Sequence, residues 1–177
     1  MTNPVPFENA VDLLDADHKL VKNMFIEYDA FCEDEAPAEA RRTLSVRICQ
    51  ALTIHARIEE EIFYPAVRKA LDDEELIDDA LAEHAEAKAL IAQILDMDPS
   101  SADYDATVKE LALAIDEQVL EEREDIFLQA QSAPLDLRAL AVPLYLRKKE
   151  LQAAAEAPPR AAGKAKGAKA SKAEVKA

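Results

Sequence analysis

Apolar residues recur at three- and four-residue spacing through most of the chain, a pattern typical of amphipathic helices. Four such stripes are separated by prolines and short polar stretches. The core-facing positions are Val11, Leu14, His18, Val21 and Phe25, then Ile48, Leu52, His55, Glu59 and Ile62, then Ile77, Ala80, His84, Ala87, Ile91 and Ile94, and finally Leu111, Ile115, Gln118, Glu122 and Ile126. The pattern predicts an all-α fold, an antiparallel up-down four-helix bundle.

Prolines divide the predicted elements. Pro65 is expected to interrupt or kink the second helix, and Pro134 and Pro143 bracket a short C-terminal helix. The leucines of that helix can either cap the bundle or form a dimer surface, and the sequence leaves both open. Beyond it the chain is rich in Ala and Lys with no apolar stripe. We therefore predict one domain over residues 1–150 and a disordered basic tail over residues 151–177.

Composition supports the helical interpretation and removes several function classes. Both glycines of the 177-residue chain, Gly163 and Gly167, lie near its C-terminus. A glycine-free body argues against a β-rich fold with tight turns and against any glycine-rich phosphate-binding loop. The two cysteines, Cys32 and Cys49, are too few for a disulfide framework and are expected to be buried structural thiols.

The charge is distributed unevenly. The chain carries a net charge of −15, but from Arg160 onward six basic residues face one acidic residue, so residues 1–157 hold 15 basic against 35 acidic residues. Such an acidic body repels nucleic acid and anionic membranes, so nucleic-acid contact is expected only through the tail. No signal peptide or membrane-spanning run is visible, which predicts a soluble cytoplasmic protein with no membrane partner.

The predicted helical stripes contain polar residues at positions that should be buried. All three histidines fall at core-facing positions of different stripes, and the fourth stripe has a glutamine at the equivalent place. In the second and fourth stripes a glutamate follows four residues later, and residues four apart share a helix face. Antiparallel packing would gather these side chains into one layer. They are the candidate metal ligands His18, His55, Glu59, His84, Gln118 and Glu122.

Buried carboxylates need a partner, because the effective desolvation penalty is several kcal/mol for each ion. The stripes offer no Lys or Arg, whereas a divalent cation would satisfy carboxylates and imidazoles together. Two simpler interpretations remain open. Glu59 and Glu122 belong to acidic runs that could form solvated faces, and a helix rotation of one position would turn them outward. Tyr28, Tyr64 and Tyr104 are expected to pack in the core or at its rim.

These residues resemble the hemerythrin-like family with the HHE cation-binding domain. The resemblance covers roughly residues 8–130 and is carried by Asp17-His18, by His55-Ala-Arg-Ile-Glu59-Glu60-Glu61-Ile-Phe-Tyr-Pro65, by Glu83-His84 and by Gln118-Val-Leu-Glu121-Glu122. It implies a four-helix bundle holding a non-heme di-iron cofactor. It also implies that His18, His55 and His84 are terminal ligands and that Glu59 and Glu122 bridge the metals.

The chain departs from that family at one ligand. The family has histidine where Gln118 stands, and an amide oxygen binds iron more weakly than imidazole does. The outcomes to weigh are a lopsided di-iron site, one metal on His55 and His84, or a metal other than iron. The fifth histidine of oxygen-carrying hemerythrins has no counterpart, so reversible O2 carriage is not expected. Ferritin-like sites need Glu-x-x-His, which the chain lacks.

Two hypotheses of function follow. The first is an iron-binding protein that senses or handles O2, nitric oxide or peroxide, or buffers iron, with at most weak oxidase or peroxidase activity at the iron and no assigned catalytic residue. The second is a metal-free bundle that binds a partner or nucleic acid through its basic tail. The sequence does not indicate the oligomeric state.

Overall fold

The computed structural model describes residues 5–71 and 74–156, and helices make up nearly all of this part of the chain. In chain order these are α1 (Ala10–Glu33), α2 (Ala38–Ile58), η1 (Glu59–Phe63), α3 (Tyr64–Leu71), α4 (Glu74–Asp96), α5 (Tyr104–Glu121), η2 (Glu122–Phe127), α6 (Leu128–Ser132) and α7 (Leu137–Glu156), where η marks a π-helical turn. The described residues form no strand, so the all-α prediction is confirmed.

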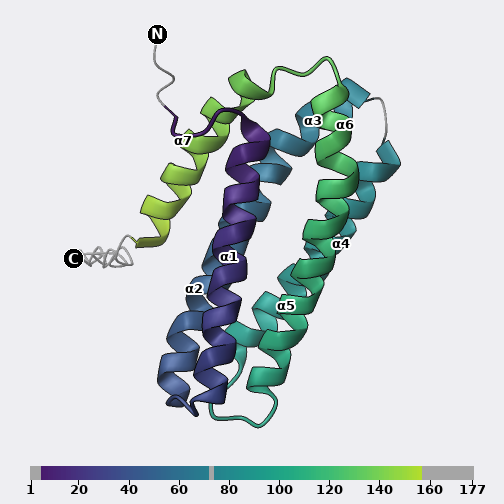
Figure 1. Ribbon diagram of the computed structural model, residues 1–177. Coiled ribbons are helices and arrows are strands. Elements are labelled where there is room, and N and C mark those ends of the chain that lie inside the picture. The colour runs from purple at the N-terminus through teal and green to yellow at the C-terminus, as the bar shows by residue number, and fades with distance from the viewer. Residues whose placement is uncertain (1–4, 72–73, 157–177) are drawn as a thin grey trace, which may run out of the picture.

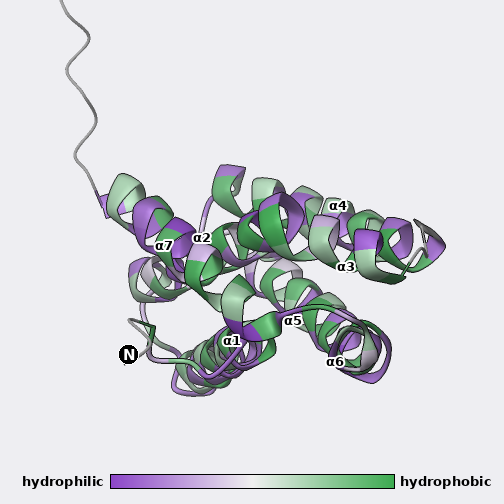
Figure 2. Cartoon of the chain, turned by 90° about the horizontal axis from the view of Figure 1, so that it is seen from above, coloured by the Kyte–Doolittle hydropathy of each residue, from purple (hydrophilic) through white to green (hydrophobic). Residues whose placement is uncertain are grey.

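Four long helical rods form the bundle. The segments α2, η1 and α3 run on without a break, as do α5, η2 and α6, and α1 and α4 supply the other two rods (Figure 1). The rods α1 and α2 lie side by side, as do α4 and α5, while α7 packs outside the bundle against α1 and α2 (Figure 2). No helix in the described ranges has an apolar stretch long enough to span a bilayer.

Both ends of α1 are stabilised without glycine, which is absent from residues 1–162. The Oδ1 atom of Asn9 accepts a hydrogen bond from the backbone N–H of Asp12 at 3.1 Å and caps the first turn. At the other end the chain turns into α2 through Glu35, whose φ is 50°. Glycine is common in this left-handed conformation after a helix, and here a glutamate adopts it.

The interior consists of two apolar clusters. One contains the C-terminal part of α1 and the facing parts of α2, α4 and α5, with Ile48 and Leu111 among its fully buried members. The other lies towards the opposite end of the bundle and includes Leu14, Phe63 and Ile77. Each of the four rods contributes to both clusters, so each rod crosses from one cluster to the other through a middle section that belongs to neither.

The prolines act differently from one another. The interruption expected at Pro65 is a π turn that ends at Phe63, and the helix then continues as α3, of which Pro65 is the second residue. Pro143 lies inside α7, which continues to Glu156, beyond the predicted boundary at residue 150. Leu144 of α7 is fully buried in the second apolar cluster, so this helix covers the bundle. The predicted tail from residue 157 onward lies outside the described residues.

Candidate metal centre

The middle sections of the four rods carry one layer of buried polar side chains between the two apolar clusters. None of these side chains is more than 7% exposed. The layer comprises the six predicted ligands His18, His55, Glu59, His84, Gln118 and Glu122. Sequence periodicity predicted this layer correctly, because the three- and four-residue spacing that defines the apolar face of each helix also defines which polar residues point inward.

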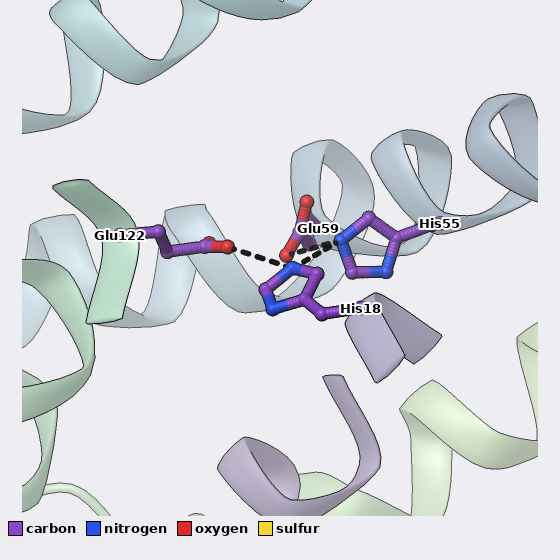
Figure 3. Close-up of side chains that lie close together, drawn as sticks. All are labelled: His18, His55, Glu59 and Glu122. Atoms are coloured by element: carbon purple, nitrogen blue, oxygen red, sulfur yellow. Dashed lines mark hydrogen bonds and ion pairs between the residues drawn. The ribbon is translucent and has the colours of Figure 1, made fainter. Parts of the chain in front are cut away.

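Four of these side chains converge on one point. The Nε2 atoms of His18 and His55 are 2.9 Å apart. Nε2 of His55 lies 3.1 Å from Oε1 of Glu59, and Nε2 of His18 lies 3.1 Å from Oε2 of Glu122. Each of the four residues offers one ligand atom, and these four atoms all lie within 4.8 Å of one another (Figure 3). A single cation at this point could therefore contact atoms from α1, α2, η1 and η2.

His84 extends the cluster on the other side of Glu59. Its Nε2 atom lies 3.3 Å from Oε2 of Glu59, while Oε1 of the same carboxylate faces His55. The two oxygens of Glu59 thus point to imidazoles on different helices. This is the arrangement that a carboxylate needs if it is to contact two metal ions.

Both buried glutamates stand at the start of a π turn. Glu59 is the first residue of η1 and Glu122 is the first residue of η2. Within η1 the backbone N–H of Tyr64 bonds to the carbonyl of Glu59, five residues back instead of four. π turns inside α-helices occur frequently at functional sites because they change the direction of the side chains that follow.

The other ring nitrogens of two histidines face carboxylates. Nδ1 of His84 lies 2.9 Å from Oε1 of Glu60, which in turn accepts hydrogen bonds from Lys88. Nδ1 of His55 lies 3.5 Å from Oδ2 of Asp17. Carboxylates in these positions orient the imidazole and leave Nε2 as the ligand atom, as is usual around metal-binding histidines.

Tyr64 is a site residue that the sequence analysis assigned to packing. Its hydroxyl donates a hydrogen bond to Oε1 of Glu122 at 3.1 Å and lies 3.3 Å from Nε2 of His84. Tyr64 packs in the second apolar cluster as expected, and in addition its hydroxyl contacts the polar layer. Tyr28 and Tyr104 lie in the first apolar cluster, away from the layer, and meet the expectation.

Gln118 lies in the layer without a hydrogen bond from its side chain to any described residue. It lines a small cavity together with His18, His55 and His84. The centre of a water-sized molecule can move within about 20 Å³ of this cavity. The cavity is therefore large enough to hold one such molecule. The rest of the lining is mostly aliphatic and includes Leu52.

The pKa values show how unevenly charge is shared among these groups. Burial and the neighbouring His55 lower the pKa of His18 to about 3. Burial opposes protonation of His55 as well, but the Glu59 and Asp17 carboxylates raise its pKa to about 10. Burial and the adjacent Glu59 raise the pKa of Glu122 well above its ordinary value. Without a metal, a proton on His55 would provide the positive charge that faces the Glu59 carboxylate.

The residues fit a divalent cation. Both oxygens of Glu59 and Oε2 of Glu122 are buried and make no hydrogen bond of acceptable geometry in the described structure. Leaving such atoms without a partner costs free energy. Imidazole nitrogens and carboxylate oxygens are the donor set that binds iron, manganese or zinc, and a cation between them would satisfy all of these atoms.

The sequence could not have revealed every residue around the site. Asp17 and Glu60 neighbour predicted ligands in the chain, but only the fold places them at the Nδ1 atoms. Glu83 and Glu121 also flank predicted ligands, and burial together with the facing Glu121 carboxyl raises the pKa of Glu83 to about 7. The sequence signals for these four acids were their proximity to predicted ligands and their place in the motifs that carry the family resemblance.

Comparison with known proteins identifies the class. Residues 9–130 match the sequence model of the family described as "Hemerythrin HHE cation binding domain". The match contains all six predicted ligands and ends before α7. This chain belongs to the hemerythrin HHE cation-binding domain family, as the sequence motifs indicated.

Two individual proteins are similar to parts of the chain. A protein of Nostoc sp. named as a DNA nickase is 31% identical over 122 residues, which are 67% of this chain but only 32% of that protein. A crystal structure of a hemerythrin HHE cation-binding domain-containing protein from Mycobacterium kansasii has the same fold, with a TM-score of 0.67 and 24% identity. That likeness covers 83% of this chain and 89% of the other.

Proposed function

We propose that this chain is a non-heme iron protein that holds two metal ions at unequal positions and senses or handles a small ligand such as O2, nitric oxide or peroxide, or buffers iron. The observation that supports this most directly is the buried cluster of two imidazoles and two carboxylates, in which both oxygens of Glu59 and Oε2 of Glu122 lack hydrogen-bond partners. Bound iron would supply electron transfer and a coordination position for the small ligand.

Each ligand has a separate task in this proposal. His55 and His84 would hold one metal, on the side of the cluster where no expected histidine is replaced. Glu59 contacts both of these imidazoles. His18 and Glu122 hold the second metal, with Gln118 as a weak additional donor. Tyr64 fixes the orientation of Glu122 by its hydrogen bond. The side with Gln118 has fewer strong donors and is therefore the side open to a ligand.

The cavity beside the imidazoles favours a small, weakly polar ligand. Its volume fits one molecule of about the size of water, and residues such as Val21, Leu52 and Ile91 give it an aliphatic lining. An apolar cavity of this size excludes larger polar substrates because they would lose their hydrogen bonds to water on entry.

Metal content tests the proposal. Protein purified without added metal, or loaded anaerobically with Fe(II), should contain about two irons per chain and absorb in the near ultraviolet after oxidation. His55→Ala and Glu59→Gln should lose most of this metal while retaining helical circular dichroism. Glu124→Gln, an exposed acid on η2, is the matched control and should retain it. Absence of metal from the wild-type chain after loading would refute the proposal.

A substitution in the cavity tests the ligand. Leu52→Phe should reduce the binding of nitric oxide to the reduced iron protein, because the larger ring fills the cavity lined by Leu52. Leu20→Phe, on an exposed position of α1, should bind nitric oxide normally. Equal iron content in both variants is needed for the comparison, and equal nitric oxide binding would rule out this cavity as the ligand site.

A second candidate function, contact with nucleic acid through the basic tail, is favoured by the similarity to a protein named as a DNA nickase. That similarity spans only 32% of the nickase, so DNA cleavage is not part of this candidate. Removing residues 158–177 should abolish any salt-sensitive retention of DNA. Unchanged retention by the shortened chain would eliminate the candidate.

A further inference from the structure

A second pocket opens on the other side of the polar layer, where α4 faces α5 and η2. About 100 Å³ of it is open to water-sized molecules. Besides Glu122 of the candidate metal centre, its lining includes four carboxylates, Asp79 and Glu83 from α4, Glu121 from α5 and Asp125 from η2. We call these residues the acidic pocket. The pocket lining contains no lysine or arginine.

The acidic pocket has no basic partner among residues 5–71 and 74–156. None of its four carboxylates forms an ion pair with any lysine or arginine in the part of the chain that the structure describes, whereas Asp17 and Glu60 beside the histidines each pair with a lysine. A concave surface of one charge sign concentrates counter-ions and speeds their arrival.

The inner wall of the acidic pocket consists of residues of the metal centre. Tyr64, Gln118 and Glu122 all line this pocket, and Glu122 also belongs to the convergent cluster. Glu122 is 98% buried, and its Oε2 atom makes no hydrogen bond in the described structure. Gln118 is 93% buried. It lines both this pocket and the cavity beside the imidazoles. An unpaired buried carboxylate oxygen in this wall, with the neighbouring Gln118 amide, offers oxygen donors to an arriving cation.

The two openings to the site suit different molecules. The cavity beside the imidazoles is largely aliphatic, so a hydrated cation would have to shed water there without compensation. The acidic pocket offers carboxylate and carbonyl oxygens, which bind a cation that still carries water. The geometry points to the acidic pocket as a transient binding site through which a divalent metal ion reaches the buried cluster, an inference that rests on the proposed metal-binding function.

The rate of metal uptake tests the inference. Metal-free full-length protein is mixed with Co(II), and the cobalt absorption bands are followed in a stopped-flow instrument. The double variant Glu83→Gln/Glu121→Gln should take up Co(II) about tenfold more slowly than wild type, with a weaker dependence on salt, and should reach the wild-type amount at equilibrium. Glu86→Gln/Glu117→Gln removes the same charge from exposed positions of α4 and α5 outside the pocket and should leave the rate near that of wild type.

Each other outcome overturns a different statement. Equal uptake rates for the two double variants would overturn the acidic pocket as the entry site and leave the metal centre standing. A loss of Co(II) at equilibrium in Glu83→Gln/Glu121→Gln would make these carboxylates part of the final site, which also overturns a transient role. No Co(II) uptake by the wild-type chain would overturn both this inference and the proposed function.

Discussion

Lys148 of α7 forms an ion pair with Asp17 of α1, and the other oxygen of that carboxylate faces Nδ1 of His55 at 3.5 Å. The three side chains are mostly buried. Because α7 lies beyond residues 9–130, which match the family, a helix outside the matched domain contacts the candidate metal centre. His55 and, to a smaller extent, Lys148 lower the pKa of Asp17 against the effect of burial. Lys148 thus holds the carboxylate that faces His55.

Removing the charge of Lys148 should weaken metal binding. Lys148→Met retains the aliphatic part of the side chain but leaves Asp17 without its cation. We expect the affinity for Co(II) or Zn(II) to fall by about 10–100-fold, the usual range when a group that orients a ligand is lost. The measurement is competition against a chelator of known affinity.

The control distinguishes orientation from packing. Lys148→Arg should recover most of the affinity because it restores the positive charge. Lys149→Met changes the neighbouring lysine, which lies over the ring of Tyr145 and not at the site, and should bind metal normally. An affinity for Lys148→Met equal to that of Lys149→Met would contradict the role given to the ion pair.

Gln118→His should complete the weaker half of the metal centre. An imidazole at this buried position supplies a stronger donor for iron than an amide, so metal content should rise towards about two per chain and the near-ultraviolet bands should change. Gln118→Leu, which has a similar size and no donor, should show neither effect. If the two variants have equal metal content, the side chain at position 118 does not reach the metal.

Metal binding should release protons. At pH 7 His55, with its pKa raised to about 10, carries a proton that a metal must displace, whereas His18, with its pKa lowered to about 3, has none to lose. Apparent affinity should therefore decrease as the pH falls below about 10, up to tenfold per pH unit for each proton displaced. Calorimetry in two buffers of different ionisation enthalpy measures this release, and identical heats in both would exclude it.

Metal removal should destabilise the fold. Free metal at 100 times its Kd stabilises the native state by about 2.7 kcal/mol, which raises Tm by about 5–10 °C for a chain of this size. Circular dichroism melts with and without Zn(II) measure the shift. His55→Ala should show little of it, and a similar shift in that variant would indicate that the metal binds elsewhere.

Helical periodicity predicts the site residues up to the π turns and fails beyond them. Counting four residues from His55 selects Glu59 instead of Glu60, and the structure buries Glu59 completely and leaves Glu60 partly exposed. Tyr64 is different. Five residues after Glu59, an α-helix would place it about 140° around the axis, but the bond from its N–H to the carbonyl of Glu59 makes that interval one full turn.

Other contacts depend on tertiary structure that no local pattern records. Asp17 shares a helix with His18 but contacts His55, 38 residues further along the chain. Lys148 meets Asp17 across 131 positions. The periodicity of the chain gives the face on which each helix is buried, whereas these pairs also require the relative shift of the helices along their axes, which is determined by the packing of both apolar clusters.

The π turns make the candidate metal centre and the second apolar cluster depend on the same chain length. Loss of one residue from η1 or η2 would restore ordinary α-helical hydrogen bonding and rotate everything beyond it by about 100°. The side chains beyond the deletion would no longer face the buried glutamate, and those that belong to the second apolar cluster, such as Val67 and Ala130, would turn out of the core. In evolutionary terms, selection for a folded bundle also retains the irregular turns on which the site depends.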